Sequence, residues 1–209
     1  MTLEALDRAA EAVHLRMIGA THEAGRTVVL LGPDGADFWP HFTASPEYAD
    51  TMPDPLDRWS KRVIGALART FGGSAAFPSD GPPWPPFTAW ALATGACHAS
   101  PVGLMVHADT GLWLSFRGAV ILPGERQLPA PRPAPCDSCA GHPCLAACPA
   151  GAMGPDGYDV AACHAWLDQP AGATCLTQGC LVRRACPPGQ KYGRLAAQSA
   201  FHMKAFHPT

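Results

Sequence analysis

Eight of the nine cysteines of this 209-residue chain lie in the segment from residue 136 to residue 186. They are Cys136, Cys139, Cys144, Cys148, Cys163, Cys175, Cys180 and Cys186. Thiolate sulfur is a soft ligand that suits iron–sulfur chemistry, and short intervals between cysteines let one loop surround several corners of a cluster. Two 4Fe-4S clusters need eight thiolates, the number present here. The segment therefore predicts a protein that carries or uses low-potential electrons.

Two of these cysteines, Cys148 and Cys186, directly precede a proline. In two-cluster ferredoxins the cysteine before proline crosses to the other cluster. The same rule here predicts one cluster on Cys136, Cys139, Cys144 and Cys186, and a second cluster on Cys148, Cys163, Cys175 and Cys180. Four residues separate Cys139 from Cys144, where two are usual, so this loop must bulge.

The eight thiols are also compatible with different chemistry. Two four-cysteine zinc sites would use the same eight ligands and would only staple a small domain. Disulfides or redox-active thiols are a further alternative, although the two Cys-Pro pairs and the uneven intervals favour iron–sulfur clusters. Arg183 and its basic neighbours could offset the clusters' negative charge or could form a solvated face. Cys97, outside the segment, is expected to be a small buried apolar residue.

Composition limits the partners of the chain. Hydrophobic residues make up 47% and charged residues 15%, against roughly 25% charged in an average domain. The surface thus has room for a covered cofactor or a partner protein. The net charge is -2 and no basic stripe is present, so nucleic acid is not expected as a partner. The charged N-terminal stretch is unlike a signal peptide and no long apolar window occurs, so we expect a cytoplasmic protein without a membrane span.

The elements before the cysteines indicate a mixed α+β domain. Apolar residues at helical spacing from Leu3 to Met17 predict a first helix, and the apolar run at 27–31 predicts a buried strand. A second helix is predicted from the capping pair Asp54-Pro55 to Gly72. The stretch from 102 to 122 predicts two strands around a turn at 109–111, with a third beginning after residue 118.

Two proline-rich segments are predicted to be irregular. The sequence GPPWPP at 81–86, with Trp84 at its middle, predicts a rigid loop. The segment 123–135 has five prolines and predicts an extended linker, so we expect one domain over 1–130 and a cysteine-rich domain over 131–209. The histidines of the final stretch, His202 and His207, either fold back over a cluster or pocket or belong to an unstructured end.

The cysteine-rich segment resembles a known family. The motif CDSCAGHPCLAACPAGAM, followed by a separate Cys163 and a closing Cys-Pro run, is similar to the dicluster module of epoxyqueuosine reductases over about residues 136 to 190. That resemblance implies a small bacterial-ferredoxin-like module with two 4Fe-4S clusters.

The preceding residues resemble a second family. The segments TVVLLGPDGADFWPHF, MPDPLDRWSKRVI and GLMVHADTGLWLSFRGAVILPG look like the CblC family, which binds cobalamin and removes its upper ligand reductively. The resemblance implies a reduced nitroreductase-like α+β fold that holds a corrinoid. Residues expected near such a cofactor are Trp84, Trp90, His98, His107 and Arg117.

Two kinds of function follow from these expectations. In the first, an oxidoreductase or cofactor-processing protein uses its two clusters to reduce a cofactor or substrate, such as cobalamin, bound by the N-terminal domain. In the second, the chain is a ferredoxin-type carrier that docks to a partner oxidoreductase and binds no small molecule. Both need a redox partner protein as electron donor or acceptor, whereas a zinc-stapled interaction module, the third hypothesis, does not.

Overall fold

The computed structural model describes residues 2–154 and 157–208. Its contacts divide the chain into two compact units, the first formed by Met1–Cys97 with Ser115–Arg132 and the second by His98–Leu114 with Pro133–Thr209. Helices are mixed with small antiparallel sheets, so the chain has an α+β fold. The boundary between Arg132 and Pro133 lies in the proline-rich segment, close to the division predicted near residue 130. The second unit also includes His98–Leu114, which the sequence does not predict.

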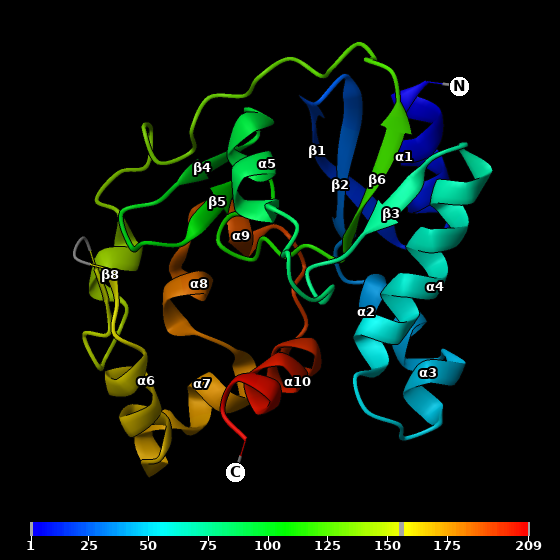
Figure 1. Ribbon diagram of the computed structural model, residues 1–209. Helices are drawn as coiled ribbons and strands as arrows, with labels where there is room; N and C mark the ends of the chain where they lie inside the picture. The colour runs from blue at the N-terminus through cyan, green and yellow to red at the C-terminus, as the bar shows by residue number, and fades with distance from the viewer. Residues whose placement is uncertain (1, 155–156, 209) are drawn as a thin grey trace. The chain divides into compact units, whose positions relative to one another are not determined.

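The first unit is built on a four-stranded antiparallel sheet in the order β1-β2-β6-β3 (Figure 1). Its strands are β1 (Leu15–Glu23), β2 (Arg26–Pro33), β3 (Ser74–Ala76) and β6 (Gly118–Pro123). β2 lies in the interior of the sheet, and its run from Thr27 to Pro33 is buried throughout. A strand that is covered on both faces needs continuous apolar residues. The predicted strand at 27–31 has such a run and lies within β2, so the prediction is confirmed.

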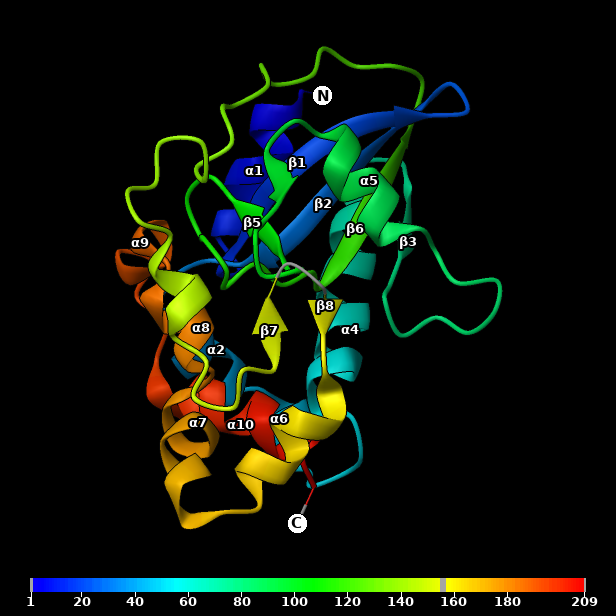
Figure 2. The ribbon, with the colours of Figure 1, turned by 90° about the vertical axis from the view of Figure 1, so that its left-hand side faces the viewer.

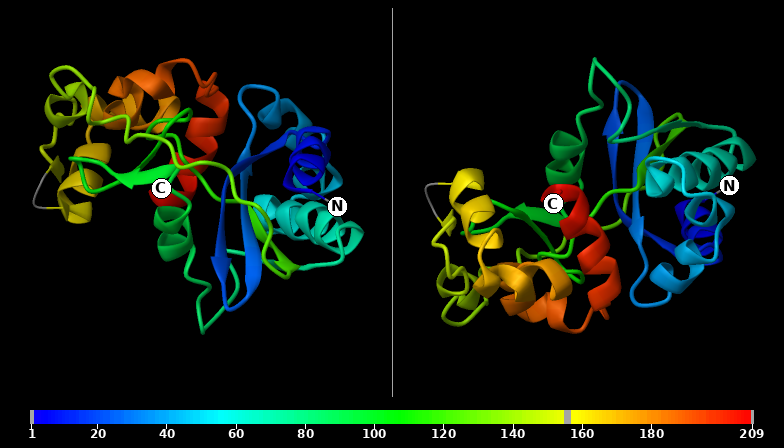
Figure 3. Two further views of the ribbon diagram at one scale, coloured as in Figure 1. Left: turned by 90° about the horizontal axis from the view of Figure 1, so that it is seen from above. Right: turned by 90° about the horizontal axis from the view of Figure 1, so that it is seen from below.

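Helices cover both faces of this sheet. They are α1 (Leu3–Glu11), α2 (Phe38–Thr43), α3 (Pro46–Ala49), α4 (Pro55–Thr70) and α5 (Phe87–Ala93). Figure 3 shows α1 and α4 on one face and α5 on the other. α4 buries Leu56, Trp59, Val63, Ile64 and Leu67, the residues whose spacing predicted it. Asp54 occupies the N-cap position as expected, but its backbone is left-handed and its side chain makes no capping hydrogen bond.

Two predictions for this part of the chain are wrong. The first helix ends at Glu11 instead of continuing to Met17, and residues Leu15–Glu23 form β1. The chain reverses at His14, which has a positive φ of 57° that a helix cannot contain. Residues 112–117 are not a strand either, because only β5 (Met105–His107) and an isolated bridge between His107 and Gly111 form at that turn.

The second unit consists of short helices and two-stranded ribbons (Figure 2). Its strands are β4 (Cys97–Ala99, whose first residue falls in the first unit), β5, β7 (Met153–Gly154) and β8 (Gly157–Tyr158). Its helices are η1 (Pro143–Ala146), α6 (Val160–Leu167), η2 (Pro170–Gly172), α7 (Ala173–Gln178), α8 (Leu181–Ala185), α9 (Pro187–Gln190) and α10 (Ala196–Phe206), with η marking 3₁₀ helices. α10 packs on α7, and η1 packs on α8.

The core of the second unit contains cysteines. Val102, Val106, Leu112, Met153 and Val182 are buried together with Cys144 and Cys186. Cys136, Cys148 and Cys180 pack against the same cluster from its margin. In the described residues, no helix is both long enough and apolar enough to cross a membrane.

Candidate metal centres

The loop from Cys136 to Cys148 is shaped by backbone conformations that few residues adopt. Gly141 and His142 both have positive φ values, 70° and 41°, which produce the bulge predicted for the four-residue interval between Cys139 and Cys144. Pro143 then begins η1, since proline suits the first turn of a helix. Nε2 of His142 lies 3.1 Å from the carbonyl oxygen of Cys136, which closes the loop.

Two short helices of the cysteine region, η1 and α8, each have cysteines of both predicted sets within or beside them. η1 contains Cys144, and Cys148 follows two residues after it. α8 has Cys180 as its N-cap residue and Cys186 as its C-cap residue. Because η1 packs on α8, these four cysteines come from the two ends of one packed helix pair. Each helix therefore presents one cysteine of each predicted set.

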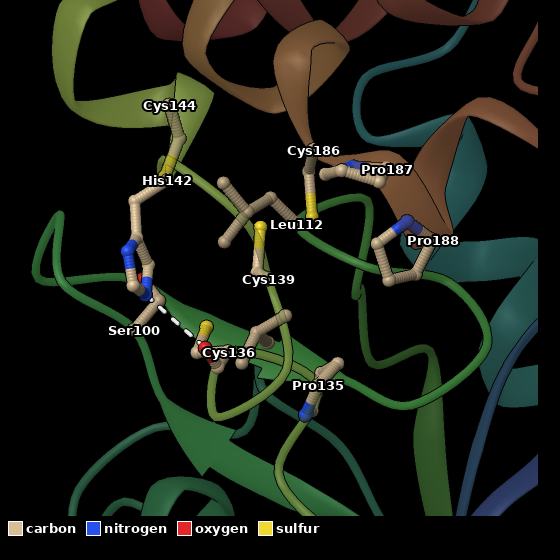
Figure 4. Close-up of a pocket in the computed structure, with 11 residues that line it drawn as sticks. Ser100, Leu112, Pro135, Cys136, Cys139, His142, Cys144, Cys186, Pro187 and Pro188 are labelled. Carbon is tan, nitrogen blue, oxygen red and sulfur yellow. Dashed lines mark hydrogen bonds between the residues drawn. The ribbon is translucent and has the colours of Figure 1, made fainter.

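The first predicted set lines a pocket in the second unit (Figure 4). The sulfur atoms of Cys136, Cys139, Cys144 and Cys186 point toward the same space. The rest of its lining is mainly apolar and proline-rich, formed by Ser100, Val106, Leu112, Pro135, His142, Pro187 and Pro188. The four thiols that the crossing rule assigned to one cluster thus surround a common cavity.

The electrostatics of these thiols give the same grouping. Burial is the main cause that raises the pKa of Cys136, followed by the charges of Cys144, Cys186 and Cys139. Burial also leads the causes that raise the pKa of Cys144, followed by the charge of Cys186. Like charges raise one another's pKa only at short range, so the thiols of this set are mutual neighbours.

The cysteines of the second predicted set come from α6, from α7, from the N-cap of α8 and from the second residue after η1. Burial raises the pKa of Cys175, and the charges of Cys180, Cys163 and Cys148 raise it further. Burial is also the main cause that raises the pKa of Cys163, and the charges of Cys180 and Cys148 raise it further. The backbone N–H of Ala152 donates to Sγ of Cys148 at 3.2 Å. None of the charges that act on Cys163 or Cys175 comes from the first set.

Within 2–154 and 157–208, no group of three or more His, Cys, Asp or Glu side chains is close enough together to hold a metal ion as the chain stands. The chemistry of the two sets still fits a sulfur-ligated group, because each gathers four thiols and no carboxylate. The hydroxyl of Ser100, at the first pocket, is buried with no hydrogen-bond partner. A donor left unpaired beside four sulfurs suits an additional acceptor atom in that pocket.

A tight turn brings residues 107–111 against the first set. Nδ1 of His107 accepts hydrogen bonds from the backbone N–H groups of Asp109 and Thr110, at 3.1 and 3.3 Å. Gly111, with φ 57°, lies so close that a Cβ there would be 2.5 Å from the nitrogen of Gly189 and 2.9 Å from Sγ of Cys186. Only glycine permits this approach, which explains why His98–Leu114 belongs to the second unit.

The five residues predicted to lie near a cofactor are divided between the two units. His98 and His107 belong to the second unit, and His107 is 2% exposed in the turn just described. In the first unit Trp84 is 65% exposed, whereas Trp90 is buried and donates from Nε1 to Glu23 at 2.8 Å. The guanidinium of Arg117 lies 3.7 Å from Asp57 and donates to the carbonyl of Phe116 at 2.9 Å.

Two further residues act on the second set. The hydroxyl of Tyr158 donates to the sulfur of Cys163, and burial followed by this bond raises the pKa of the phenol far above its usual value. Arg183 of α8 donates to the carbonyl oxygen of Leu112, and burial lowers the pKa of its guanidinium. In the sequence Arg183 is only one member of a basic group. Sequence reasoning misses Tyr158, since a single tyrosine between cysteines has no distinctive spacing.

The final residues are helical and folded back. Nδ1 of His207 lies 2.5 Å from Nδ1 of His164, and Nε2 of His207 lies 3.1 Å from Asp168. His164 directly follows Cys163 in α6. Of the two alternatives for this segment, the unstructured end is wrong, because Ala196–Phe206 form α10 and His207 contacts α6, the helix that contains Cys163. Folding back over a cluster stays a prediction.

Cys97 is separate from both sets. It is buried in the first unit, and burial raises the pKa of its thiol to about 11 despite a hydrogen bond with Thr94. A thiol in such an apolar setting stays protonated and unreactive at neutral pH. No family model, curated protein or solved structure matches this chain.

Proposed function

We propose that this chain is an iron–sulfur redox protein whose second unit holds two 4Fe-4S clusters and transfers electrons. The observation that carries the proposal is the grouping of the eight thiols. The pocket and the mutual charges produce the sets Cys136/Cys139/Cys144/Cys186 and Cys148/Cys163/Cys175/Cys180, the same sets that follow from the crossing rule. The crossing rule and the proximity of the thiols support the same division of the eight cysteines.

The surroundings of both sets suit one-electron chemistry. Bound clusters would supply a centre that accepts and releases single electrons. The apolar core formed by Val106, Leu112 and Val182 limits the access of water to the cysteines packed against it. Because Cys144, Cys186, Cys148 and Cys180 touch one core cluster, the two sets lie within a single packed region of the second unit. Short separation between centres is what electron transfer inside a protein requires.

For the acceptor, we propose a cofactor or substrate bound by the first unit, and a corrinoid is the version that the CblC resemblance implies. The nitroreductase-like arrangement of that unit belongs to the same proposal. Its support is the resemblance together with an α+β unit whose sheet is covered on both faces. Adding hydroxocobalamin to the purified chain should shift the corrinoid spectrum and leave the corrinoid on the protein through a desalting column. An unchanged spectrum with no retention would remove this acceptor.

A simple ferredoxin-type carrier is the second candidate. It is favoured by the structural roles of Trp90 and Arg117, which are engaged with Glu23 and Asp57. In this version the electrons leave to a partner oxidoreductase. Reversible reduction of the clusters, without binding of any corrinoid, is the expected behaviour.

Metal and sulfide analysis of anaerobically purified protein tests the iron–sulfur proposal directly. We expect a brown protein with about eight irons and about eight acid-labile sulfides per chain. A colourless protein with about two zinc ions would replace the proposal by the zinc-stapled module. Repeating the analysis with hydroxocobalamin present separates the two candidates for the acceptor.

A further inference from the structure

A serine lies at the pocket of the first set without a hydrogen-bond partner for its side chain. Ser100 lines this pocket together with the four thiols (Figure 4). Its hydroxyl oxygen is buried, and no atom of the described residues hydrogen-bonds to it. Leaving a buried hydroxyl unpaired costs free energy, so its presence here points to a partner supplied by a bound group or by water.

The backbone of Ser100 is held by a tight turn. Its N–H donates to the carbonyl oxygen of Leu104 at 3.0 Å, and its own carbonyl oxygen accepts from the N–H of Gly103 at 3.2 Å. Pro101 follows directly and favours an extended backbone at Ser100. The turn leads into β5, whose Val106 lines the same pocket. Ser100 therefore has a fixed backbone position at the pocket wall.

The rest of the lining offers few hydrogen-bond donors to a group in this pocket. The N–H of Cys139 donates to the carbonyl oxygen of Cys136 at 3.2 Å. The N–H of Cys186 donates to the carbonyl oxygen of Arg183 at 3.4 Å. Three further lining residues are prolines, which have no backbone N–H: Pro135, Pro187 and Pro188.

The one other polar side chain of the described lining is already engaged. Nε2 of His142 lies 3.1 Å from the carbonyl oxygen of Cys136 and donates to it, so Nδ1 of the neutral ring carries no proton. The backbone of Leu145 and of Cys144 itself hydrogen-bonds to the sulfur of Cys144. Apart from the thiols, Ser100 is thus the side chain of the described lining that has an unused donor.

Reduction adds one negative charge to a 4Fe-4S cluster, and hydrogen bonds to its sulfur atoms stabilise that charge. Resting on the proposed function, we propose that the hydroxyl of Ser100 donates a hydrogen bond to a sulfur atom of the cluster on the first set and raises the reduction potential of this centre. In the reduction step the cluster takes up one electron from an external one-electron reductant, and Ser100 keeps its proton. Ser100 is then a cofactor-binding residue outside the cysteine motif.

The test is a potentiometric titration of the anaerobically prepared full-length chain, followed by electron paramagnetic resonance. We expect two reduction waves. Ser100→Ala should keep the iron and lower the reduction equilibrium constant of one wave by about tenfold, or about 59 mV for a one-electron couple, because a hydrogen bond to the charged state is lost. Ser100→Thr retains a hydroxyl and should restore most of the potential.

A ligand variant assigns the affected wave to a set. Cys163→Ser removes a ligand of the second set, so the wave that remains in this variant belongs to the first set. Adding Ser100→Ala to it should lower that wave by the same factor. If Cys163→Ser binds no cluster, the shift of a single wave by Ser100→Ala in the otherwise unchanged chain still decides the question.

Thr110→Val is the matched control. Thr110 also has a buried hydroxyl without a partner, in the turn that contacts the first set, but it is not one of the residues that line the pocket. This substitution should move neither wave.

A second readout detects the hydrogen bond itself. After exchange into D₂O, electron–nuclear double resonance of the reduced first centre should show a strongly coupled deuteron. The signal should be absent from Ser100→Ala and present in Ser100→Thr.

The outcomes distinguish this inference from the proposed function. A chain without iron or sulfide fails the proposed function itself. A chain with about eight irons, in which Ser100→Ala changes neither a wave nor the deuteron signal, shows that the hydroxyl binds water and overturns the inference alone. Equal shifts in Ser100→Ala and Thr110→Val, or loss of iron from Ser100→Ala, also overturn it, because the role of the hydroxyl would then be structural.

Discussion

At the scale of single residues, the neighbours of a thiol in the fold decide whether it is available as a ligand. Cys97 and Cys186 are both buried, yet they differ in their neighbours. Burial keeps the thiol of Cys97 protonated, whereas Cys186 lines a pocket with three other thiols. Burial alone therefore does not separate a structural cysteine from a candidate ligand.

This difference predicts opposite effects of the same substitution. If the proposed clusters are bound, Cys186→Ser should reduce the iron content from about eight to about four per chain or fewer, because one cluster loses a ligand. Cys97→Ser should leave the iron content unchanged. Iron and sulfide analysis of both variants, prepared in parallel, measures the effect. Retention of about eight irons by Cys186→Ser would contradict its assignment as a ligand.

A second residue-scale prediction concerns Glu47, which is buried and forms a two-pronged ion pair with Arg62, including a contact of 2.9 Å from the second nitrogen. The hydrogen bond from Arg62 lowers the pKa of Glu47 below the ordinary 4.5. The carboxylate thus stabilises the fold fully above about pH 4.5 and progressively loses this contribution as the pH falls through its lower folded value.

Urea unfolding of the first unit, followed from pH 7 to pH 3, checks this sign. The wild type should be more stable than Glu47→Gln at neutral pH, and the difference should shrink in acid. A difference that is constant with pH would show that the ion pair does not contribute through the charge of Glu47.

At the scale of elements, α4 shows what a sequence pattern can determine. Its apolar residues recur at helical spacing and meet one face of a sheet, so the local pattern and the packing agree. β1 escapes sequence-based prediction because the alternation of its residues is obscured by the apolar spacing that continues from α1. The strand expected at 112–117 does not form, since Leu112 and Trp113 are buried in the second unit without a partner strand.

The packing of α4 predicts a large effect at Trp59. This side chain is fully buried and meets Phe38 edge-on, with ring centroids 5.4 Å apart. Trp59→Ala should lower the free energy of unfolding by about 3–5 kcal/mol, because it leaves a cavity. Lys61→Ala, on the same helix, removes an exposed ion pair with Asp80 and a contact of Nζ with the ring of Phe77, and should cost about 1 kcal/mol or less. Urea denaturation of both variants makes the comparison, and equal losses would contradict it.

At the scale of the whole molecule, the candidate metal centres depend on contacts that no local pattern encodes. The Cys-Pro pairs let the sequence predict that Cys186 groups with Cys136, Cys139 and Cys144, and these four thiols line one pocket. The contact of residues 107–111 with the first set could not be predicted, since it depends on the close approach of Gly111 to Gly189, which is far away in the sequence. The binding of Tyr158 to Cys163 depends on tertiary packing in the same way.

The two units also predict how the chain, if it holds the proposed clusters, responds to removal of iron. The first unit has its own apolar core around β2, whereas the core of the second unit includes the cysteines themselves. Chelation under reducing conditions should therefore increase hydrogen exchange in residues 98–114 and 133–208 and leave β2 and β6 protected. Hydrogen-exchange mass spectrometry before and after chelation measures this. An equal loss of protection in β2 would show that the two units unfold together.

The position of α8 between Cys180 and Cys186 has a consequence for maturation and damage. With two bound clusters, this five-residue helix would be anchored at each end to a different centre. Oxidative breakdown of one cluster would release one end of the helix and loosen the other centre. Half-filled chains should then be short-lived, and assembly and decay of the two centres should be cooperative.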